Sequence, residues 1–138
     1  MVKQGQYKNF DKLLLEAIDE DLFSLGEVVR ASIYIHLEGS FNIKKKEIPR
    51  ELSDFSSALE QIFGLGARYL EILFMKNIHA KLEVTCKWPT YRYPLSKWIV
   101  TEMTFQEFVR LVQRSFEAAY SEKLKMGVLV NELEILQK

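Results

Sequence analysis

The sequence predicts an α+β fold that is mainly helical, with five or more helices and one β-hairpin before the last long helix. Apolar residues recur at helical spacing over most of the chain, and residues that favour helix caps separate these stretches. From Glu83 the spacing changes to the alternation of a strand. With 138 residues, of which 48% are apolar, the chain can bury one sizeable core. We expect a single compact domain over 1–120 and a tail over 121–138.

The first helix is expected from about Phe10 to Phe23, with Asn9 as its cap, because five apolar residues follow at helical spacing. These are Leu13, Leu14, Ala17, Ile18 and Leu22. Ser24 and Glu27 then have the spacing of a capping box, which predicts that the second helix begins at Ser24.

The second helix should end at Gly39, a residue that adopts the left-handed capping conformation at little cost. Its apolar residues cover more than one face, which predicts a central and buried helix. They are Val28, Val29, Ile33, Tyr34, Ile35 and Leu37. A connection over 41–48 follows.

Proline and glycine mark the next two helices. Pro49 should open the third helix at its first position, where the missing N–H costs nothing, and Gly64 should close it. Gly66 begins the fourth helix, which we expect to be largely buried. The apolar residues of these two helices are Phe55, Leu59, Ile62, Phe63, Leu70, Ile72, Leu73, Phe74, Met75, Ile78 and Leu82.

The hairpin is expected over about 83–101. Val84, Cys86 and Trp88 alternate with polar residues, and 98–101 is the second strand. Thr104 then starts a second capping box, which predicts a helix with Phe105, Phe108, Val109, Val112, Phe116 and Ala119 on its apolar side.

The tail carries a spaced set of apolar residues, namely Met126, Leu129, Leu133 and Leu136. A small domain can leave such a stripe exposed, and exposed apolar stripes mark interfaces, so the tail is a candidate contact in a homodimer. A strand, or a hook over the chain's own core, is the alternative.

Three blocks of the chain resemble the Nitrosopumilus output domain family (output domain five). They are Leu25-Gly-Glu27 through Ile33-Tyr-Ile-His-Leu-Glu38, then Phe41 through Ile48-Pro49 to Phe55, then Ala58-Leu-Glu-Gln-Ile-Phe-Gly-Leu-Gly-Ala67 with Leu70-Glu71 and His79. Downstream, Lys87-Trp88 and Phe105-Gln-Glu-Phe-Val109 with Arg114-Ser-Phe116 also resemble the family. Members of this archaeal family occur alone or attached to sensory modules, where they are presumed to pass on a signal. The resemblance implies an architecture and a signalling context, without an established biochemical activity.

Charge and segment composition exclude several function classes. Nineteen basic residues balance nineteen acidic ones, so the chain as a whole has no attraction to phosphate. No apolar run is long enough to span a bilayer and the start lacks a signal peptide, which predicts a cytoplasmic protein without membrane contact. The single cysteine, Cys86, is compatible with a reducing compartment.

No catalytic or cofactor motif is recognisable. His36, His79, Glu38 and Cys86 are metal-ligand types, but their spacing does not favour a site. We expect His36 to hydrogen-bond inside the core and Cys86 to act as a small buried apolar residue. The pair Gly64 and Gly66 lacks the third glycine of a dinucleotide fingerprint. We therefore expect no catalytic residue, metal or cofactor.

The leading hypothesis is a non-enzymatic regulatory or signal-output module that contacts a protein partner or itself. The second is a DNA-binding regulator of the winged-helix kind, in which Lys87, Arg92 and Lys97 of the hairpin meet phosphate. The fourth helix argues against it, since it offers few cations to bases. A small-molecule-binding protein or an enzyme with an apolar pocket is the third.

Overall fold

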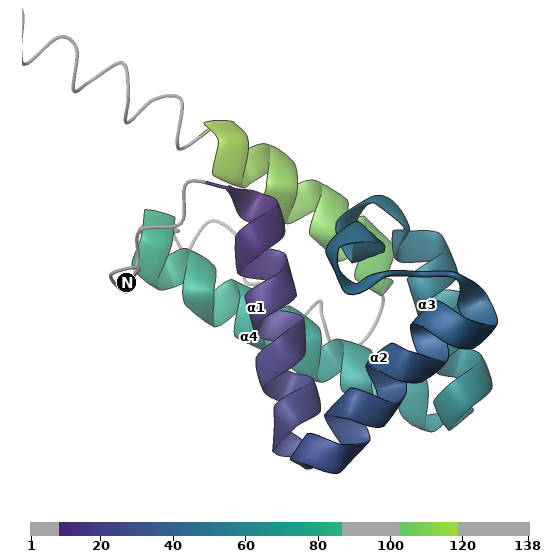
Figure 1. Ribbon diagram of the computed structural model, residues 1–138. Coiled ribbons are helices and arrows are strands. Elements are labelled where there is room, and N and C mark those ends of the chain that lie inside the picture. Colours follow the sequence, from purple (N-terminus) through teal and green to yellow (C-terminus); the bar gives the residue numbers. More distant parts are fainter. Residues whose placement is uncertain (1–8, 87–102, 119–138) are drawn as a thin grey trace, which may run out of the picture.

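A computed structural model describes residues 9–86 and 103–118 of the chain (Figure 1). These residues form six helices and no strand. In order, they are α1 (Phe10–Ser24), α2 (Glu27–Phe41), the 3₁₀ helix η1 (Lys45–Arg50), α3 (Leu52–Phe63), α4 (Gly66–Cys86) and a helix over 105–118. The predicted α+β class is therefore wrong for the described part of the chain, which is helical.

The first predicted strand of the hairpin illustrates the error. Residues 83–86 are the last turn of α4 and not extended backbone. Three alternating apolar residues are weak evidence for a strand, whereas a helix that is already formed gains one hydrogen bond for each residue it adds. The remainder of the predicted hairpin, with Lys87, Arg92 and Lys97, lies outside the described residues, as does the tail with Met126, Leu129, Leu133 and Leu136.

Helix α1 lies at the centre of the described bundle. It packs across α4 on one side and against α2 on another, while α3 packs on α4 (Figure 1). Its predicted stripe is confirmed, because its buried residues are Phe10, Leu13, Leu14, Ala17, Ile18 and Leu22. The helix over 105–118 contacts the core at two places. The ring of Phe116 lies 5.7 Å from that of Phe10 of α1, and the ring of Phe105 packs beside those of Phe55 of α3 and Phe74 of α4.

Three phenylalanines form an aromatic cluster in the core. Phe55 of α3, Phe74 of α4 and Phe105 are all fully buried, with ring centroids 5.7 to 6.4 Å apart. Aromatic pairs at this separation are attractive beyond the area they bury. The cluster therefore ties together three segments that are distant in the sequence.

Two predicted helix starts are confirmed by hydrogen bonds. The side chain of Asn9 accepts from the backbone N–H of Asp11 at 2.8 Å, at the start of α1. The hydroxyl of Thr104 accepts from the N–H of Glu107 at 3.1 Å, at the start of the helix over 105–118. Phe105, Phe108, Val109, Val112 and Phe116 are buried on that helix, as predicted, whereas Ala119 lies outside the described residues.

The predicted start and end of α2 are wrong. Ser24 is the last residue of α1, where its hydroxyl donates to the carbonyl of Asp21, and Gly26 caps α2 instead. The helix continues through Gly39 to Phe41, and its C-cap is Asn42, which takes the left-handed conformation with a φ of 56°. Asparagine tolerates this conformation better than most residues, so it replaces the expected glycine.

The prediction for Pro49 is also wrong, since Pro49 lies inside η1 and α3 begins at Leu52. Proline fixes φ near the helical value, which suits a 3₁₀ turn as well as the first turn of an α-helix. The predictions for the two glycines of the next corner are confirmed: Gly64 follows the last residue of α3 with a positive φ of 61°, and Gly66 begins α4.

Across 9–86 and 103–118, no helix has the length and apolar character needed to cross a membrane.

Candidate protein-interaction surface

Helix α2 differs from its neighbours in how little it buries. Of its 15 residues only Ile33 and Leu37 are buried, whereas α1, of the same length, buries six. Val28 is 79% exposed and Ile35 is 72% exposed. The prediction of a central, buried α2 is therefore wrong. Apolar residues on two faces of α2 indicate that each face contacts another surface. The described residues cover only one of these two faces.

The exposed residues form a continuous line on the helix, which we call the outer stripe: Val28, Ala31, Ser32 and Ile35. All four are exposed. At 3.6 residues per turn, Val28 and Ile35 lie on one side two turns apart, with Ala31 and Ser32 between them. The same period places the stripe opposite Ile33 and Leu37. One face of α2 thus packs on the domain while the other faces outward.

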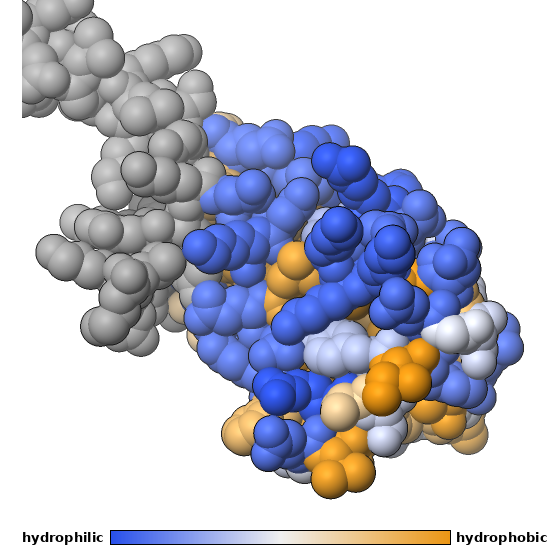
Figure 2. Space-filling view, in the orientation of Figure 1, coloured by the Kyte–Doolittle hydropathy of each residue, from blue (hydrophilic) through white to orange (hydrophobic). Residues whose placement is uncertain are grey.

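The outer stripe is flanked by few charges. Glu27, Arg30 and Glu38 are the charged residues of α2, and Arg30 turns towards α1. The guanidinium of Arg30 also lies 4.9 Å from the ring centroid of Phe23, at the α1–α2 corner. In Figure 2, apolar surface lies along α2 from the lower edge of the molecule, within a surface that is otherwise mostly hydrophilic. Exposed apolar patches of this kind mark contacts with other proteins.

A second exposed apolar group lies at the beginning of α4. Leu65 is 93% exposed, Tyr69 is 74% exposed and Leu73 is 45% exposed. This group corrects the expectation for the fourth helix in part: Leu70, Phe74, Met75, Ile78 and Leu82 are buried as predicted, but Leu73 is not.

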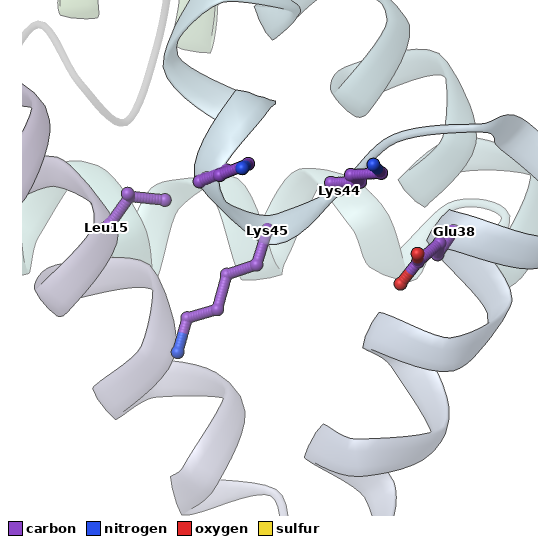
Figure 3. A pocket seen from close by; sticks show the side chains of 5 residues that line it. Leu15, Glu38, Lys44 and Lys45 are labelled. Carbon is purple, nitrogen blue, oxygen red and sulfur yellow. The ribbon is translucent and has the colours of Figure 1, made fainter.

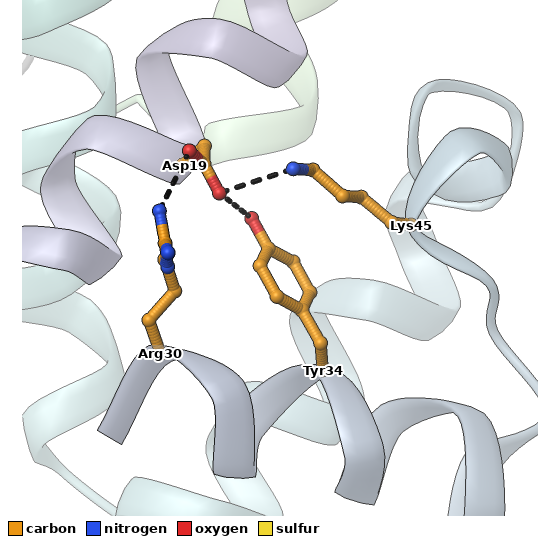
Figure 4. Close-up of polar contacts among 4 residues, drawn as sticks. All are labelled: Asp19, Arg30, Tyr34 and Lys45. Atoms are coloured by element: carbon orange, nitrogen blue, oxygen red, sulfur yellow. Dashed lines mark hydrogen bonds and ion pairs between the residues drawn. The ribbon is translucent and has the colours of Figure 1, made fainter. Parts of the chain in front are cut away.

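A polar joint fixes α2 to the rest of the domain. The carboxylate of Asp19 on α1 accepts from the hydroxyl of Tyr34 at 2.8 Å, from Lys45 Nζ at 3.1 Å and from Arg30 Nη1 at 3.2 Å (Figure 4). The ammonium of Lys45 also lies 5.0 Å from the ring centroid of Tyr34. One carboxylate therefore joins α1, α2 and η1, and it holds the outer stripe on a supported helix.

The joint determines the ionisation of its members. Burial disfavours the charged form of Asp19, but hydrogen bonds from Tyr34 and Lys45, with the charges of Lys45 and Arg30, outweigh it and lower the pKa of Asp19. Burial and the hydrogen bond to Asp19 raise the pKa of Tyr34. Asp19 stays ionised and Tyr34 stays protonated at neutral pH, so the joint is present under ordinary conditions.

An open hollow of about 440 Å³ lies beside the end of α2 (Figure 3). Leu15, Glu38 and the three lysines Lys44, Lys45 and Lys46 line it. Lys45 turns away to Asp19, and the other two lysines are exposed. The residues that line the hollow include no nucleophile paired with a base, and the three lysines with Glu38 give this end of α2 a net positive charge.

His36, His79 and Glu38 do not form a metal site in the described part of the chain. Within the described ranges, no group of His, Cys, Asp and Glu is arranged to hold a metal ion. His36 is exposed on α2, with Nδ1 at 3.5 Å from the hydroxyl of Ser40, so the prediction of a core hydrogen bond is wrong. Cys86 ends α4, and its side chain is outside the described part, so its predicted burial stays a prediction.

Two acidic side chains at helix contacts were not anticipated from the sequence. Glu71 of α4 is buried and accepts from the hydroxyl of Ser56 on α3 at 3.0 Å, and burial raises its pKa. Asp21 of α1 faces α4 with one buried carboxylate oxygen, Oδ2, that has no hydrogen-bond partner in the described structure. Burial raises the pKa of Asp21 from 3.8 to about 6, against a favourable contact with Asn77.

Asp21→Asn should stabilise the fold at pH 7. The pKa of Asp21 is higher in the folded state than in the unfolded state, so the wild-type protein loses stability as the pH rises from about 4 to 6. At pH 7 the wild-type protein therefore contains a charged, half-buried carboxylate. The shift corresponds to at most about 3 kcal/mol. Because half of the group is accessible to water, we expect a gain of roughly 1 kcal/mol. Urea unfolding at pH 7 and pH 4 measures it.

The gain from Asp21→Asn should shrink towards zero at pH 4. Glu20→Gln is the control, because Glu20 accepts from Lys81 and Asn77 at 3.0 and 3.1 Å and its replacement should not stabilise. Equal effects of Asp21→Asn at both pH values would contradict the explanation from ionisation.

Comparison of the chain with models of known protein families, with curated proteins and with solved structures found no match. The resemblance to the Nitrosopumilus output domain family therefore stays a prediction based on the quoted residues.

Proposed function

We propose that this protein is a non-enzymatic interaction module that binds a protein through the outer stripe of α2. The supporting observation is the exposure of Val28 and Ile35, at 79% and 72%, on a helix whose opposite face is fixed by Ile33, Leu37 and the Asp19 joint. A rigid helix that presents apolar side chains is one of the common ways in which proteins recognise each other. Covering these side chains would remove apolar surface from water.

The role of the module is proposed to be regulatory, as the output part of a signalling system in the cytoplasm of an archaeal-type cell. This part of the proposal depends on the family resemblance, which covers roughly 13–119. The arrangement of the described residues is compatible with it, because helix corners and apolar faces, and not paired acids, bases or nucleophiles, are the main features of the matching blocks.

The two alternatives have less support. The DNA-binding hypothesis requires a hairpin, and the residues at its expected start, 83–86, belong to α4. The exposed positions on the first half of α4 are largely apolar and include Tyr69 and Leu73, so the helix offers little to base edges. The third hypothesis requires an enclosed apolar pocket, whereas the hollow beside α2 in the described part of the chain is open and lined by Leu15, Glu38 and three lysines.

A capture experiment with matched variants tests the proposal. The full chain is immobilised as wild type, as the double variant Val28→Glu with Ile35→Glu, and as the control Tyr69→Glu. Glutamate is a good helix former, so the double variant should keep α2 folded while placing charge on the stripe. Tyr69 is 74% exposed on another helix, which matches the stripe residues in exposure.

We expect immobilised wild type and Tyr69→Glu to retain the same binding protein, which can be a second copy of this chain. The double variant should not retain it. Circular dichroism of all three chains checks that the helices are intact. Equal retention by the double variant and wild type would contradict a role for the outer stripe.

A further inference from the structure

We propose that the protein covering the outer stripe is a second copy of this chain, with the two α2 helices packed antiparallel about a twofold axis. The inference rests on the proposed function, because it names the partner of the same surface. It follows from two observations: the order of large and small residues along the stripe, and the charges at the two ends of α2.

The stripe has the same pattern when read in either direction. Val28 and Ile35 are large and apolar, and the small residues Ala31 and Ser32 lie midway between them. In an antiparallel pair with the axis between residues 31 and 32, Val28 of each copy lies opposite Ile35 of the other. The small residues at the axis allow the helices to approach closely. A twofold contact requires this kind of self-complementary surface.

The charges beside the stripe favour the antiparallel direction. Glu27 and Glu38 are 11 residues apart, about three turns, so they lie on one side of α2. Glu27 stands at the start, whereas Glu38 shares the end with Lys44, Lys45 and Lys46. Even with Lys45 neutralised by Asp19, the remaining two lysines outnumber Glu38 by one charge.

An antiparallel pair places the negative start of one α2 beside the positive end of the other. A parallel pair would place like charges together, and it would also align the two helix dipoles. Charges at the rim of a contact set orientation and the rate of association more than they set affinity. The charge pattern therefore selects the direction of the pair, while Val28 and Ile35 supply the buried apolar area.

Sedimentation velocity over a range of protein concentrations tests the association. We expect the full chain to form a dimer, the double variant Val28→Glu with Ile35→Glu to be a monomer, and Tyr69→Glu to remain a dimer. A version ending at Tyr120 should also remain a dimer. Circular dichroism confirms that each monomeric chain is folded. A folded wild-type chain that is monomeric throughout would overturn the proposal.

A dimer that survives the double variant but is lost on truncation at Tyr120 would overturn it too, because the contact would then belong to the tail with Met126, Leu129, Leu133 and Leu136. Such a result would leave the tail as the dimer element expected from the sequence.

Disulfide trapping tests the direction of the pair. Val28→Cys and Ile35→Cys are prepared separately in a Cys86→Ala background and oxidised alone and as a mixture. The antiparallel pair should give a covalent dimer mainly in the mixture, because residue 28 faces residue 35. Strong crosslinking of each variant with itself, and none between them, would indicate a parallel pair and overturn the proposed arrangement.

The two proposals fail in different ways. A chain that is monomeric by sedimentation, yet captures another protein only when Val28 and Ile35 are intact, contradicts the second copy and supports the interaction module. A chain that neither self-associates nor captures a protein through the stripe contradicts both.

Discussion

Phe74→Ala should lower the free energy of unfolding by about 3–5 kcal/mol. Phe74 is fully buried, and its ring lies 6.2 Å from that of Phe55 and 5.7 Å from that of Phe105. The change to alanine removes the ring of α4 that contacts both α3 and the helix over 105–118, and it leaves a cavity between the three helices. Domains of this size have stabilities of about 5–15 kcal/mol, so the variant should be close to unfolding.

Urea unfolding followed by circular dichroism measures this effect. Leu73→Ala is the matched control, since Leu73 precedes Phe74 on the same helix but is 45% exposed. We expect the control to cost much less, since its side chain leaves no enclosed cavity when shortened. Similar losses for the two variants would mean that the aromatic cluster is not the centre of the core.

Gly64→Ala should lower the free energy of unfolding by roughly 1–3 kcal/mol. Gly64 has φ of 61° and ψ of −130°, a combination that side chains with a Cβ strongly disfavour. Apart from its two chain neighbours, a Cβ added at Gly64 would meet no atom within 4 Å, so crowding against the rest of the domain does not contribute. The whole cost therefore comes from the backbone conformation at the α3–α4 corner, and urea unfolding measures it.

Gly39→Ala is an informative control, because it should raise the free energy of unfolding, whereas Gly64→Ala should lower it. Gly39 lies within α2, an added Cβ there would also meet no atom within 4 Å, and alanine favours a helix over glycine. We expect a small gain in stability at a protein concentration where the chain is monomeric. A loss at Gly39 equal to that at Gly64 would contradict the explanation from φ and ψ.

Local signals in the sequence predicted much of the helical fold. Asn9 and Thr104 are confirmed as caps, and the apolar spacing of α1 and of the helix over 105–118 matches their buried faces. These features depend on residues a few positions apart, so the chain itself specifies them. The positive φ at Gly64 belongs to the same class, since few other residues fit that corner.

Features that depend on tertiary contacts were predicted less well. The alternation at Val84 and Cys86 suggested a strand, but the existing α4 continues through them. The Asp19 joint connects residues 11, 15 and 26 positions apart, and no local pattern marks it. The apolar residues of α2 were recognised, yet hydrophobicity alone does not tell whether the covering surface belongs to the same domain. The sequence therefore identified the apolar residues of the candidate site, but it did not predict that they form an exposed surface.

The division of α2 into two faces has a consequence for how such a domain can change over generations. Ile33, Leu37, Arg30 and Tyr34 hold the helix in place, while Val28 and Ile35 touch little of the domain. Exposed positions usually tolerate replacement within about 0.5 kcal/mol of stability. Mutations at the outer positions can therefore change the exposed surface of this helix without endangering folding, while its anchoring side remains the same.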